Sequence, residues 1–202
     1  SNLYRSNAPS DFEYLGGTID DAAGEAFDKV ANMLGLPYPG GPAISRVALN
    51  GDCKAHAFPR SFLKDNSKIA FSFSGLKTAV RYAITGGATS EFVRPDMSEQ
   101  QIADLAASFE DAVVDCLVGK AMLALKQSGL NTLCVGGGVA ANKHLRARLE
   151  SAAQDAGATL HIAPFELCTD NAVMGAVALE KLTAGLVETL AMDTVPGLVR
   201  HG

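Results

Sequence analysis

Four polar residues recur at helical spacing near the start of the chain, and they are Asp21, Glu25, Asp28 and Asn32. Gly24 lies beside them, although glycine inside a helix costs about 1 kcal/mol relative to alanine. Such a row of carboxylates could meet ribose hydroxyls or a hydrated cation, and the glycine would let the ligand come close. A solvated acidic face, the usual meaning of a charge stripe, explains the pattern equally. The residues alone leave both interpretations open.

A proline-flanked glycine pair follows this helix. Pro39 and Pro42 restrict the backbone around Gly40 and Gly41, which can adopt conformations closed to other residues. We therefore predict a rigid turn at 37–42. Such a turn could present peptide N–H groups to a ligand, or it could be a plain connector.

A second glycine-rich segment, residues 133–142, has the pattern of a strand, a glycine turn and a helix start. The turn is Gly136, Gly137 and Gly138, and Asn142 is placed to cap the helix. The missing Cβ atoms would admit a flat or phosphorylated ligand, and the N–H groups of the helix start favour an anion. The segment is neither the dinucleotide-binding fingerprint nor the P-loop. Nucleotide contact and a tight structural turn both fit it.

Two more segments carry polar groups at predicted helix starts. Ser74 ends a predicted strand, and Lys77 falls in the first turn of the next helix. A hydroxyl and a lysine there could bind an anion, or Ser74 could be a simple N-cap. Asp170 could likewise cap a helix or bind a metal. The four histidines, at 56, 144, 161 and 201, lack metal-binding spacing, so other ligands of a metal at Asp170 would have to come from elsewhere.

The elements that would hold these residues alternate between strand and helix. Strands are predicted at 2–5, 12–16, 68–73, 132–135 and 159–163. Helices are predicted at 18–34, 43–49, 76–84 and 99–127, from about 142, and at 170–186. Thr18 with Asp21, and Ser98 with Gln101, are predicted capping boxes. The strand–helix–strand order of the second half predicts a parallel strand pair, and 51–67 and 85–97 are expected to be loops.

The composition is that of a globular protein, with 48% hydrophobic and 19% charged residues. No run of about 18 apolar residues predicts a transmembrane helix. Four cysteines without a C-x-x-C pair favour a reducing, cytoplasmic compartment, with neither disulfides nor a zinc site. Cys116 and Cys134 are expected in apolar surroundings.

The net charge of −5 is weak evidence against a dedicated nucleic-acid-binding module. A local basic patch could still meet RNA, and a solvated surface is an equally good interpretation of the same residues. The two small basic clusters are Lys54, Arg60, Lys64 and Lys68, and Lys143, Arg146 and Arg148.

Together, five segments resemble one family, in the family's order: residues 24–29, 38–42, 71–78, 137–142 and 168–171. The family is the tRNA adenosine threonylcarbamoyltransferases, formerly called glycoproteases or O-sialoglycoprotein endopeptidases. Each segment is moderately specific alone, but five in order over nearly the whole chain are very specific. The resemblance implies an α/β fold of the actin-like ATPase type, shared with sugar kinases, Hsp70 and ribonuclease H, with only part of the two-lobed protein present.

The resemblance implies transfer of a threonylcarbamoyl group from threonylcarbamoyl-AMP to the N6 amine of the adenosine beside the anticodon of tRNA. Matched by motif, the residues that would contact ATP or threonylcarbamoyl-AMP are Asp28, Gly41, Gly137, Gly138 and Asn142. Asp170 would bind a divalent metal, iron or zinc, acting as a Lewis acid. The family's two metal-binding histidines lie upstream of the segment present here, so the chain alone is expected to be inactive.

The resemblance also divides the chain. Residues 1–16 would be remnant strands of the N-terminal lobe, 17–170 the second lobe, and 171–202 a C-terminal helix and tail. Expected partners are tRNA, a paralogous subunit and a small ATPase subunit, with no membrane. Apolar surface left by a missing lobe would favour a homodimer. Ser45 is a departure, since some members carry Asp four residues after the second glycine of the Gly-Gly-Pro turn.

Two other functions would keep this fold. A paralogous scaffold subunit would have no catalytic role, and a sugar or acetate kinase would need an acceptor site in the other lobe. The old peptidase name finds no support, because the chain has no G-x-S-x-G motif and no recognisable Ser-His-Asp constellation.

Overall fold

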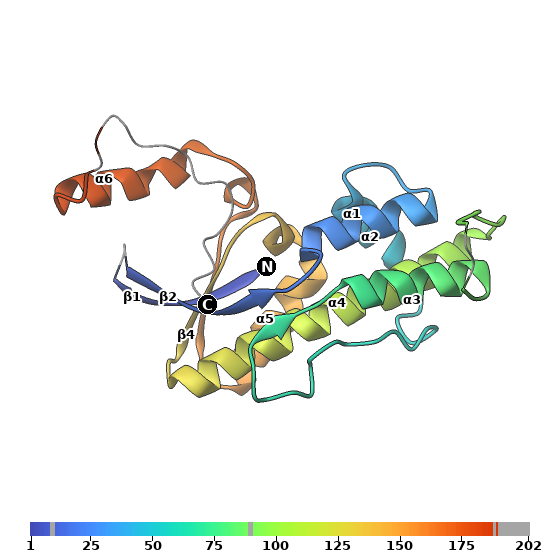
Figure 1. The fold of residues 1–202 in the computed structure, drawn as a ribbon, viewed down its shortest axis with the longest axis horizontal. Coiled ribbons are helices and arrows are strands. Elements are labelled where there is room, and N and C mark those ends of the chain that lie inside the picture. Colours follow the sequence, from blue (N-terminus) through green and yellow to red (C-terminus); the bar gives the residue numbers. More distant parts are fainter. Residues whose placement is uncertain (9–10, 89–90, 188, 190–202) are drawn as a thin grey trace.

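The computed structural model describes residues 1–8, 11–88, 91–187 and 189 and has a mixed α/β architecture (Figure 1). The strands are β1 (Asn2–Ala8), β2 (Asp11–Thr18), β3 (Ala70–Phe71), β4 (Thr132–Val135) and β5 (Thr159–Ile162). The helices are α1 (Ala23–Leu34), α2 (Gly40–Ala48), α3 (Ser74–Thr85), α4 (Glu99–Ser128), α5 (Lys143–Asp155) and α6 (Ala176–Thr183). Three 3₁₀ turns complete the described elements: η1 (Gly138–Ala141), η2 (Phe165–Leu167) and η3 (Ala172–Gly175).

The strands form two small sheets. In the first, of order β1-β2-β3, β1 and β2 pair antiparallel and β2 and β3 pair parallel. In the second, β4 and β5 pair parallel, with Thr132 opposite Thr159, which confirms the parallel pair predicted for the second half. The strand predicted at 132–135 is confirmed as β4, whose residues alternate between exposed and half-buried. Cys134 is accordingly exposed, whereas Cys116 is buried as expected, and all four cysteines are free thiols.

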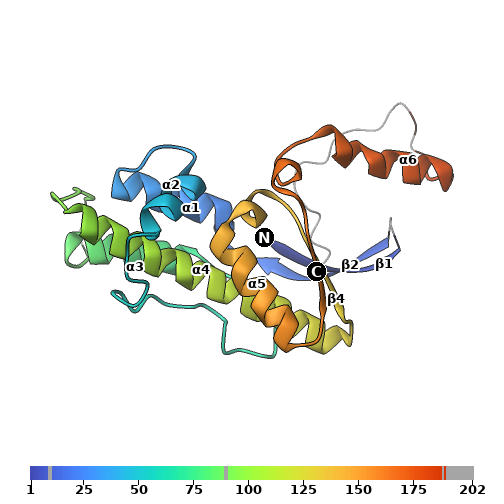
Figure 2. The ribbon, with the colours of Figure 1, turned by 180° about the vertical axis from the view of Figure 1, so that it is seen from behind.

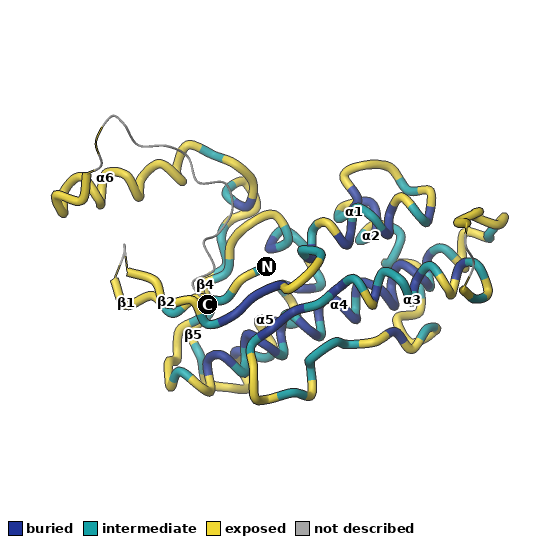
Figure 3. The backbone as a smooth tube through the Cα atoms, in the orientation of Figure 1, coloured by how far each residue is buried: buried dark blue, intermediate teal, exposed yellow. Residues whose placement is uncertain are grey.

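Helix α4 lies at the centre of the core (Figure 3). It packs against α1, α2 and α3, and further along its length against α5, which Figure 2 shows from behind. The Phe27 and Phe109 rings meet edge to face, with centroids 5.2 Å apart. The predicted N-terminal cap of α4 is confirmed, since Ser98 and Gln101 form both hydrogen bonds of a capping box. Because neighbours surround α4 on several sides, polar Ser108, Glu110 and Lys120 are buried on it as well.

The start of α1 differs from its prediction. Thr18 belongs to β2 and pairs with Phe71 of β3, so the helix begins only at Ala23 and the predicted Thr18–Asp21 capping box is wrong. At Thr18, pairing between β2 and β3 outweighs the local helix signal. The predicted end at Leu34 is confirmed, with Gly35 as a left-handed C-cap.

Two helices begin earlier than predicted. Helix α2 starts at Gly40, so the segment expected as a rigid turn supplies its first turn, where Pro42 is tolerated. Helix α3 starts at Ser74, so the N-cap is Phe73 and the N-cap interpretation of Ser74 is wrong. The predicted strand 68–73 shrinks to the two residues of β3.

The end of the described chain is less regular than predicted. The helix expected over 170–186 is divided into η3 and the short α6. Helix α6 projects from the body and is exposed along its length (Figures 1 and 3). None of the helices within the described ranges is long and apolar enough to cross a membrane. The division of the chain at residues 16 and 170 stays a prediction.

Candidate functional site

The first contact between predicted site residues joins α1 to the start of α2. Asp28 Oδ1 accepts a hydrogen bond of 2.7 Å from the backbone N–H of Gly40. A Cβ on Gly40 would lie 2.5 Å from Asp28 Cα, so this glycine is required for the two helices to approach. The carboxylate thus satisfies one of the N–H groups that a helix start leaves without a partner.

Gly41 has a different environment from Gly40. A Cβ built on Gly41 would meet nothing within 4 Å, so packing does not require glycine there. Its local reason is the following Pro42, because a residue with a Cβ is disfavoured in helical conformation before proline. The first turn of α2 therefore leaves free space next to the half-buried Gly41.

A second cluster joins α2, α4 and the glycine turn. Asn142 Nδ2 donates hydrogen bonds to Glu110 Oε1 at 2.6 Å and to Ser45 Oγ at 3.0 Å. Ser45 Oγ in turn donates to the same Glu110 oxygen at 2.6 Å. Asn142 Oδ1 accepts from the backbone N–H of Leu145 at 2.8 Å, which confirms Asn142 as the N-cap of α5. One asparagine therefore fixes both a helix start and a three-residue contact.

Glu110 is the residue that sequence reasoning missed. It is only 7% exposed, although a charged side chain is rarely buried without a partner. The available signal was its position, because it lies four residues from Ala106 and from Val114, both buried, on a helix otherwise assigned an apolar face. It supplies a carboxylate beside Ser45, the position at which the sequence showed none.

The glycine turn lies open to solvent. Gly136, Gly137 and Gly138 are all exposed, and a Cβ on any of them would meet nothing within 4 Å. Only Gly137 has a backbone conformation that favours glycine, with φ of +90°. The turn is connected to α1, since a Cβ on Gly24 would lie 3.6 Å from Val139 Cγ2. The group that comes close to Gly24 is thus Val139, which follows this turn, and the distance is that of an ordinary van der Waals contact.

Lysines pair with two of the predicted carboxylates, Asp21 just before α1 and Glu25 within it. Asp21 receives Lys29 Nζ at 2.8 Å and Lys77 Nζ at 2.7 Å, and Glu25 receives Lys29 Nζ at 2.6 Å. Hydrogen bonds from Lys29 and then Lys77 hold the pKa of Asp21 below its usual value. Asp21 and Glu25 therefore serve as ion-pair partners, and Lys77 is engaged with Asp21.

Asp28 lies at the edge of an open hollow of about 460 Å³ that is also lined by Asn32, Lys77 and Phe92. A hollow of about 520 Å³ lies elsewhere, along residues 60–65, away from the predicted site residues.

The segment leading to Asp170 is tied to the glycine turn through Arg146. The guanidinium donates to the carbonyls of Ala140 and Ala163 at 2.6 and 2.5 Å, and it lies 3.3 Å from Cys168 Sγ. Its centre is 4.1 Å from the ring of Phe165. Asp170 itself is exposed and precedes η3, whose cap is Asn171, so its predicted place at the start of a long helix is wrong.

A metal centre cannot be assembled from the part of the chain that the structure describes. No three His, Cys, Asp or Glu side chains gather there in a way that could hold a metal ion. Asp170 could supply at most one ligand, and the other ligands would have to come from outside the described residues.

One arginine from each predicted basic cluster is engaged in ion pairs within the fold. Arg60 pairs with Asp111 and Asp115 at 2.8 and 3.0 Å, and Arg148 pairs with the same two carboxylates at 3.2 and 2.6 Å. This network joins the loop before β3 to α4 and α5. Arg60 and Arg148 therefore act as structural cross-links, and their charges are compensated by Asp111 and Asp115.

Comparison with known proteins covers nearly the whole chain. The sequence profile described as tRNA N6-adenosine threonylcarbamoyltransferase matches residues 1–177. A tRNA N6-adenosine threonylcarbamoyltransferase of Rhodopirellula baltica is 53% identical over 209 aligned residues, which cover 99% of this chain and 58% of the relative. The chain thus spans little more than half the length of that relative.

Proposed function

The chain belongs to the tRNA N6-adenosine threonylcarbamoyltransferase family, and from that membership we propose that it carries part of the nucleotide site of such an enzyme. The whole protein would transfer a threonylcarbamoyl group from threonylcarbamoyl-AMP to the N6 amine of the adenosine beside the anticodon of tRNA. Because the chain spans 58% of its relative, the complete activity belongs to a longer protein.

The proposed reaction is an acyl transfer from a mixed anhydride. The N6 nitrogen forms a bond to the carbamoyl carbonyl carbon, the bond from that carbon to the phosphate oxygen breaks, AMP leaves, and the amine loses a proton. The anhydride is already activated, so the protein mainly has to orient it against the amine. No side chain of this chain needs to form a covalent intermediate.

One observation carries the proposal, namely that three of the five family segments meet in space. Asp28 contacts the start of α2 at Gly40, and Ser45 of α2 contacts Asn142, which follows the glycine turn. The open backbone at Gly41 and at Gly138 would face the nucleotide, since no side chain of the described residues would lie against a Cβ there. Asp28, Gly41, Gly137, Gly138 and Asn142 line or brace this surface in the proposal.

The finer fold assignment is part of the same proposal. We assign residues 17–170 to the second lobe of an actin-like ATPase fold and residues 1–16 to remnant strands of the N-terminal lobe, with the nucleotide held between the two lobes. The structure supports the coarser statement of a mixed α/β chain with small sheets.

The metal and the partners are also proposed. A divalent metal, iron or zinc, would take Asp170 as one ligand, but the described residues do not form the remainder of its site, so no step is derived through it. A paralogous subunit, a small ATPase subunit and a cytoplasmic location complete the proposal.

Thermal unfolding with and without ATP and magnesium tests the nucleotide site. The 202-residue chain is measured beside the full-length protein. Ligand at about 100 times its dissociation constant should stabilise the binding form by about 2.7 kcal/mol. A shift in both proteins places most of the site in this chain, and a shift only in the full-length protein means that the site is shared between lobes.

The absence of a shift in either protein would contradict the nucleotide assignment. The scaffold alternative, in which a paralogous subunit keeps the fold without binding a nucleotide, would then explain the family membership better. Transfer of a phosphoryl group to a sugar or acetate, without threonylcarbamoyl transfer to tRNA, would instead favour a kinase.

A further inference from the structure

Glu110 is a buried carboxylate that none of the family segments contains. It lies on α4 and is 7% exposed, between buried Phe109 and Ala112. The hydrogen bonds that reach it come from Ser45 and Asn142, and both end on the same oxygen, Oε1. No ion pair to Glu110 is formed by the residues that the structure describes. The carboxyl group is therefore held by neutral donors, and burial of a polar group costs free energy unless its hydrogen bonds are satisfied.

The second oxygen of Glu110 is an available acceptor. Oε2 receives no hydrogen bond from the described residues. Glu110 is not fully enclosed either, because 7% of its surface stays exposed. A carboxylate with one oxygen fixed and the other open is oriented to accept a hydrogen bond from a ligand.

The hydrogen-bonded neighbours of Glu110 place its carboxylate beside the two segments that the proposed nucleotide site uses. Ser45 lies four residues after Gly41, on the same face of α2. Asn142 follows the glycine turn directly, through η1. Both N–H groups of the Asn142 amide are directed to Ser45 and Glu110, and its oxygen caps α5. Asn142 thus acts as a brace that holds Glu110.

We propose that Glu110, held by Ser45 and Asn142, accepts a hydrogen bond from a ribose hydroxyl of the bound nucleotide. This inference rests on the proposed function, because it assumes that a nucleotide occupies the surface between α2 and the glycine turn. A carboxylate repels phosphate and can only accept, so its partner must be a donor such as a sugar hydroxyl. Glu110 makes the site select ribonucleotides over deoxyribonucleotides.

The experiment compares sugar variants of one nucleotide. Dissociation constants of ATP, 2′-deoxy-ATP and 3′-deoxy-ATP are measured by calorimetry on the full-length protein and on its Glu110→Gln variant. The native protein should prefer ATP over one of the deoxynucleotides by roughly tenfold to hundredfold, as expected for a hydrogen bond to a charged group. Glu110→Gln should weaken ATP binding by a similar factor. It should also bring the ratio of the dissociation constants for the deoxynucleotide and ATP close to one.

The control and a second variant keep the test decisive. Glu150→Gln removes the same charge from an exposed position of α5 and should change neither affinity nor preference. If Glu110→Gln does not fold, Ser45→Ala removes one of the two donors that orient the carboxylate, and it should reduce the ribose preference while Asn142 still caps α5.

Each remaining outcome has a separate meaning. Failure of the native protein to bind ATP would contradict the proposed function itself. ATP binding with an unchanged ribose preference in Glu110→Gln, or an equal loss for all three nucleotides, would reduce Glu110 to a structural role and overturn the inference. Inosine triphosphate serves as the last arm, because a preference for ATP over this nucleotide that vanishes in Glu110→Gln would assign the acceptor to the adenine amine instead.

Discussion

Some glycines of the chain are required by packing, whereas others have free space where a ligand could approach the backbone. Gly16 and Gly51 are fixed by packing, because a Cβ on either would lie about 2 Å from a backbone oxygen of Ile69 or Ala103. Gly138 has no such neighbour and no unusual φ, so the fold does not require it. A ligand that approaches the backbone would require it, since a methyl group there would hold that ligand away.

Gly138→Ala is therefore expected to leave stability within about 0.5 kcal/mol of the native value. It should weaken ATP binding by the full-length protein at least about tenfold, the equivalent of 1.4 kcal/mol. Urea unfolding and calorimetry measure the two quantities. Gly175→Ala is the matched control, because Gly175 is equally open and lies far along the chain in η3. Equal nucleotide affinity in both variants would argue that the turn is only structural.

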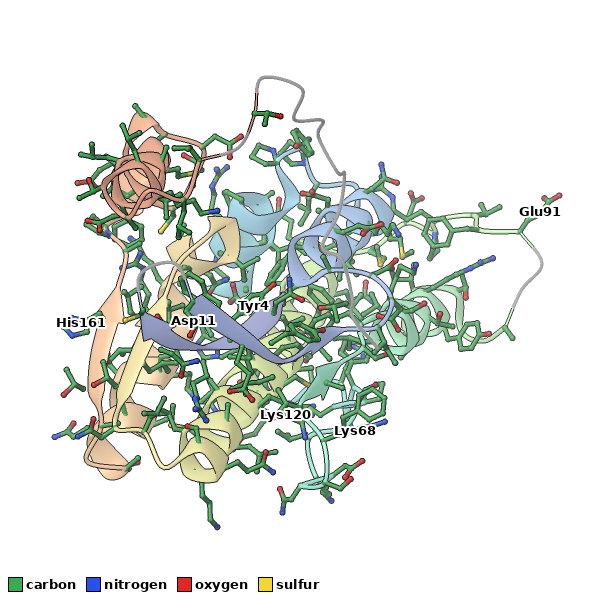
Figure 4. The ribbon with its side chains drawn as sticks, turned by 60° about the vertical axis from the view of Figure 1, so that its left-hand side comes forward. Tyr4, Asp11, Lys68, Glu91, Lys120 and His161 are labelled. Atoms are coloured by element: carbon green, nitrogen blue, oxygen red, sulfur yellow. The ribbon has the colours of Figure 1, made fainter. Side chains whose placement is uncertain are left out.

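Lys120 is the other residue whose setting is unusual. It is fully buried on α4, and its ammonium donates to the carbonyls of Asp65 and Lys68 at 2.5 and 3.0 Å. Figure 4 shows Lys120 beside Lys68 below the first sheet. Burial lowers the pKa of Lys120. The side chain ties the loop before β3 to α4 at a point where backbone carbonyls turn inward.

Lys120→Met is expected to destabilise the chain by roughly 1–3 kcal/mol, because it leaves two inward carbonyls without a donor. The free energy of unfolding in urea measures the loss. Lys126→Met, on the exposed side of the same helix, should change it by less than about 0.5 kcal/mol. A stability of Lys120→Met equal to the native value would mean that water satisfies both carbonyls.

At the scale of elements, a shared carboxylate joins α1 to α3. Asp21 precedes α1, and its side chain is 15% exposed between Lys29 of α1 and Lys77 of α3. The pair of lysines stabilises the ionised form of Asp21, so its pKa in the folded chain lies below the unfolded value near 3.8. The resulting stabilisation is complete above the unfolded pKa and is lost as the pH falls through the folded pKa.

Asp21→Asn should consequently reduce stability by about 1.5–3 kcal/mol near neutral pH, the size of hydrogen bonds to a charged group. The difference from the native chain should shrink as the pH falls below about 4. Urea unfolding at a series of pH values measures it. Asp155→Asn, at an exposed position, should show no comparable gap. A gap that persists unchanged in acid would rule out the ionised carboxylate as its source.

At the scale of the whole molecule, the described C-terminal part exposes apolar side chains. Large apolar side chains in this part are between 47% and 66% exposed. They include Val173, Met174, Val177, Leu179, Leu182 and Leu186. Apolar side chains grouped in this way favour association more than scattered ones do. The homodimer expected from the sequence would use this surface.

Self-association of the 202-residue chain should thus depend on concentration in light scattering. The double substitution Leu179→Lys and Leu182→Lys should raise the dissociation constant at least about tenfold without loss of folding, because both leucines are exposed. The control adds the same charge to α5 through Ser151→Lys and Gln154→Lys. A native chain that stays monomeric at every accessible concentration would contradict the homodimer.

Strong local signals fixed several elements from the sequence. The capping box at Ser98 predicted the start of α4, because a cap satisfies backbone groups within a few residues. The strand–helix–strand order predicted the parallel pairing of β4 with β5. At Thr18 the local helix signal gave a wrong prediction. Thr18 pairs with Phe71, far along the chain, and this strand pairing outweighs the signal.

The residue types of the candidate site, and the family to which they belong, were readable in the sequence because their order along the chain is itself the signal. Their roles in space were decided by tertiary contacts. Only packing of α2 and the glycine turn against α4 brings Ser45 and Asn142 to Glu110, and only the meeting of α1 with α3 engages Asp21 with Lys77. Such contacts join residues 32 to 97 positions apart, a separation at which no local spacing rule operates.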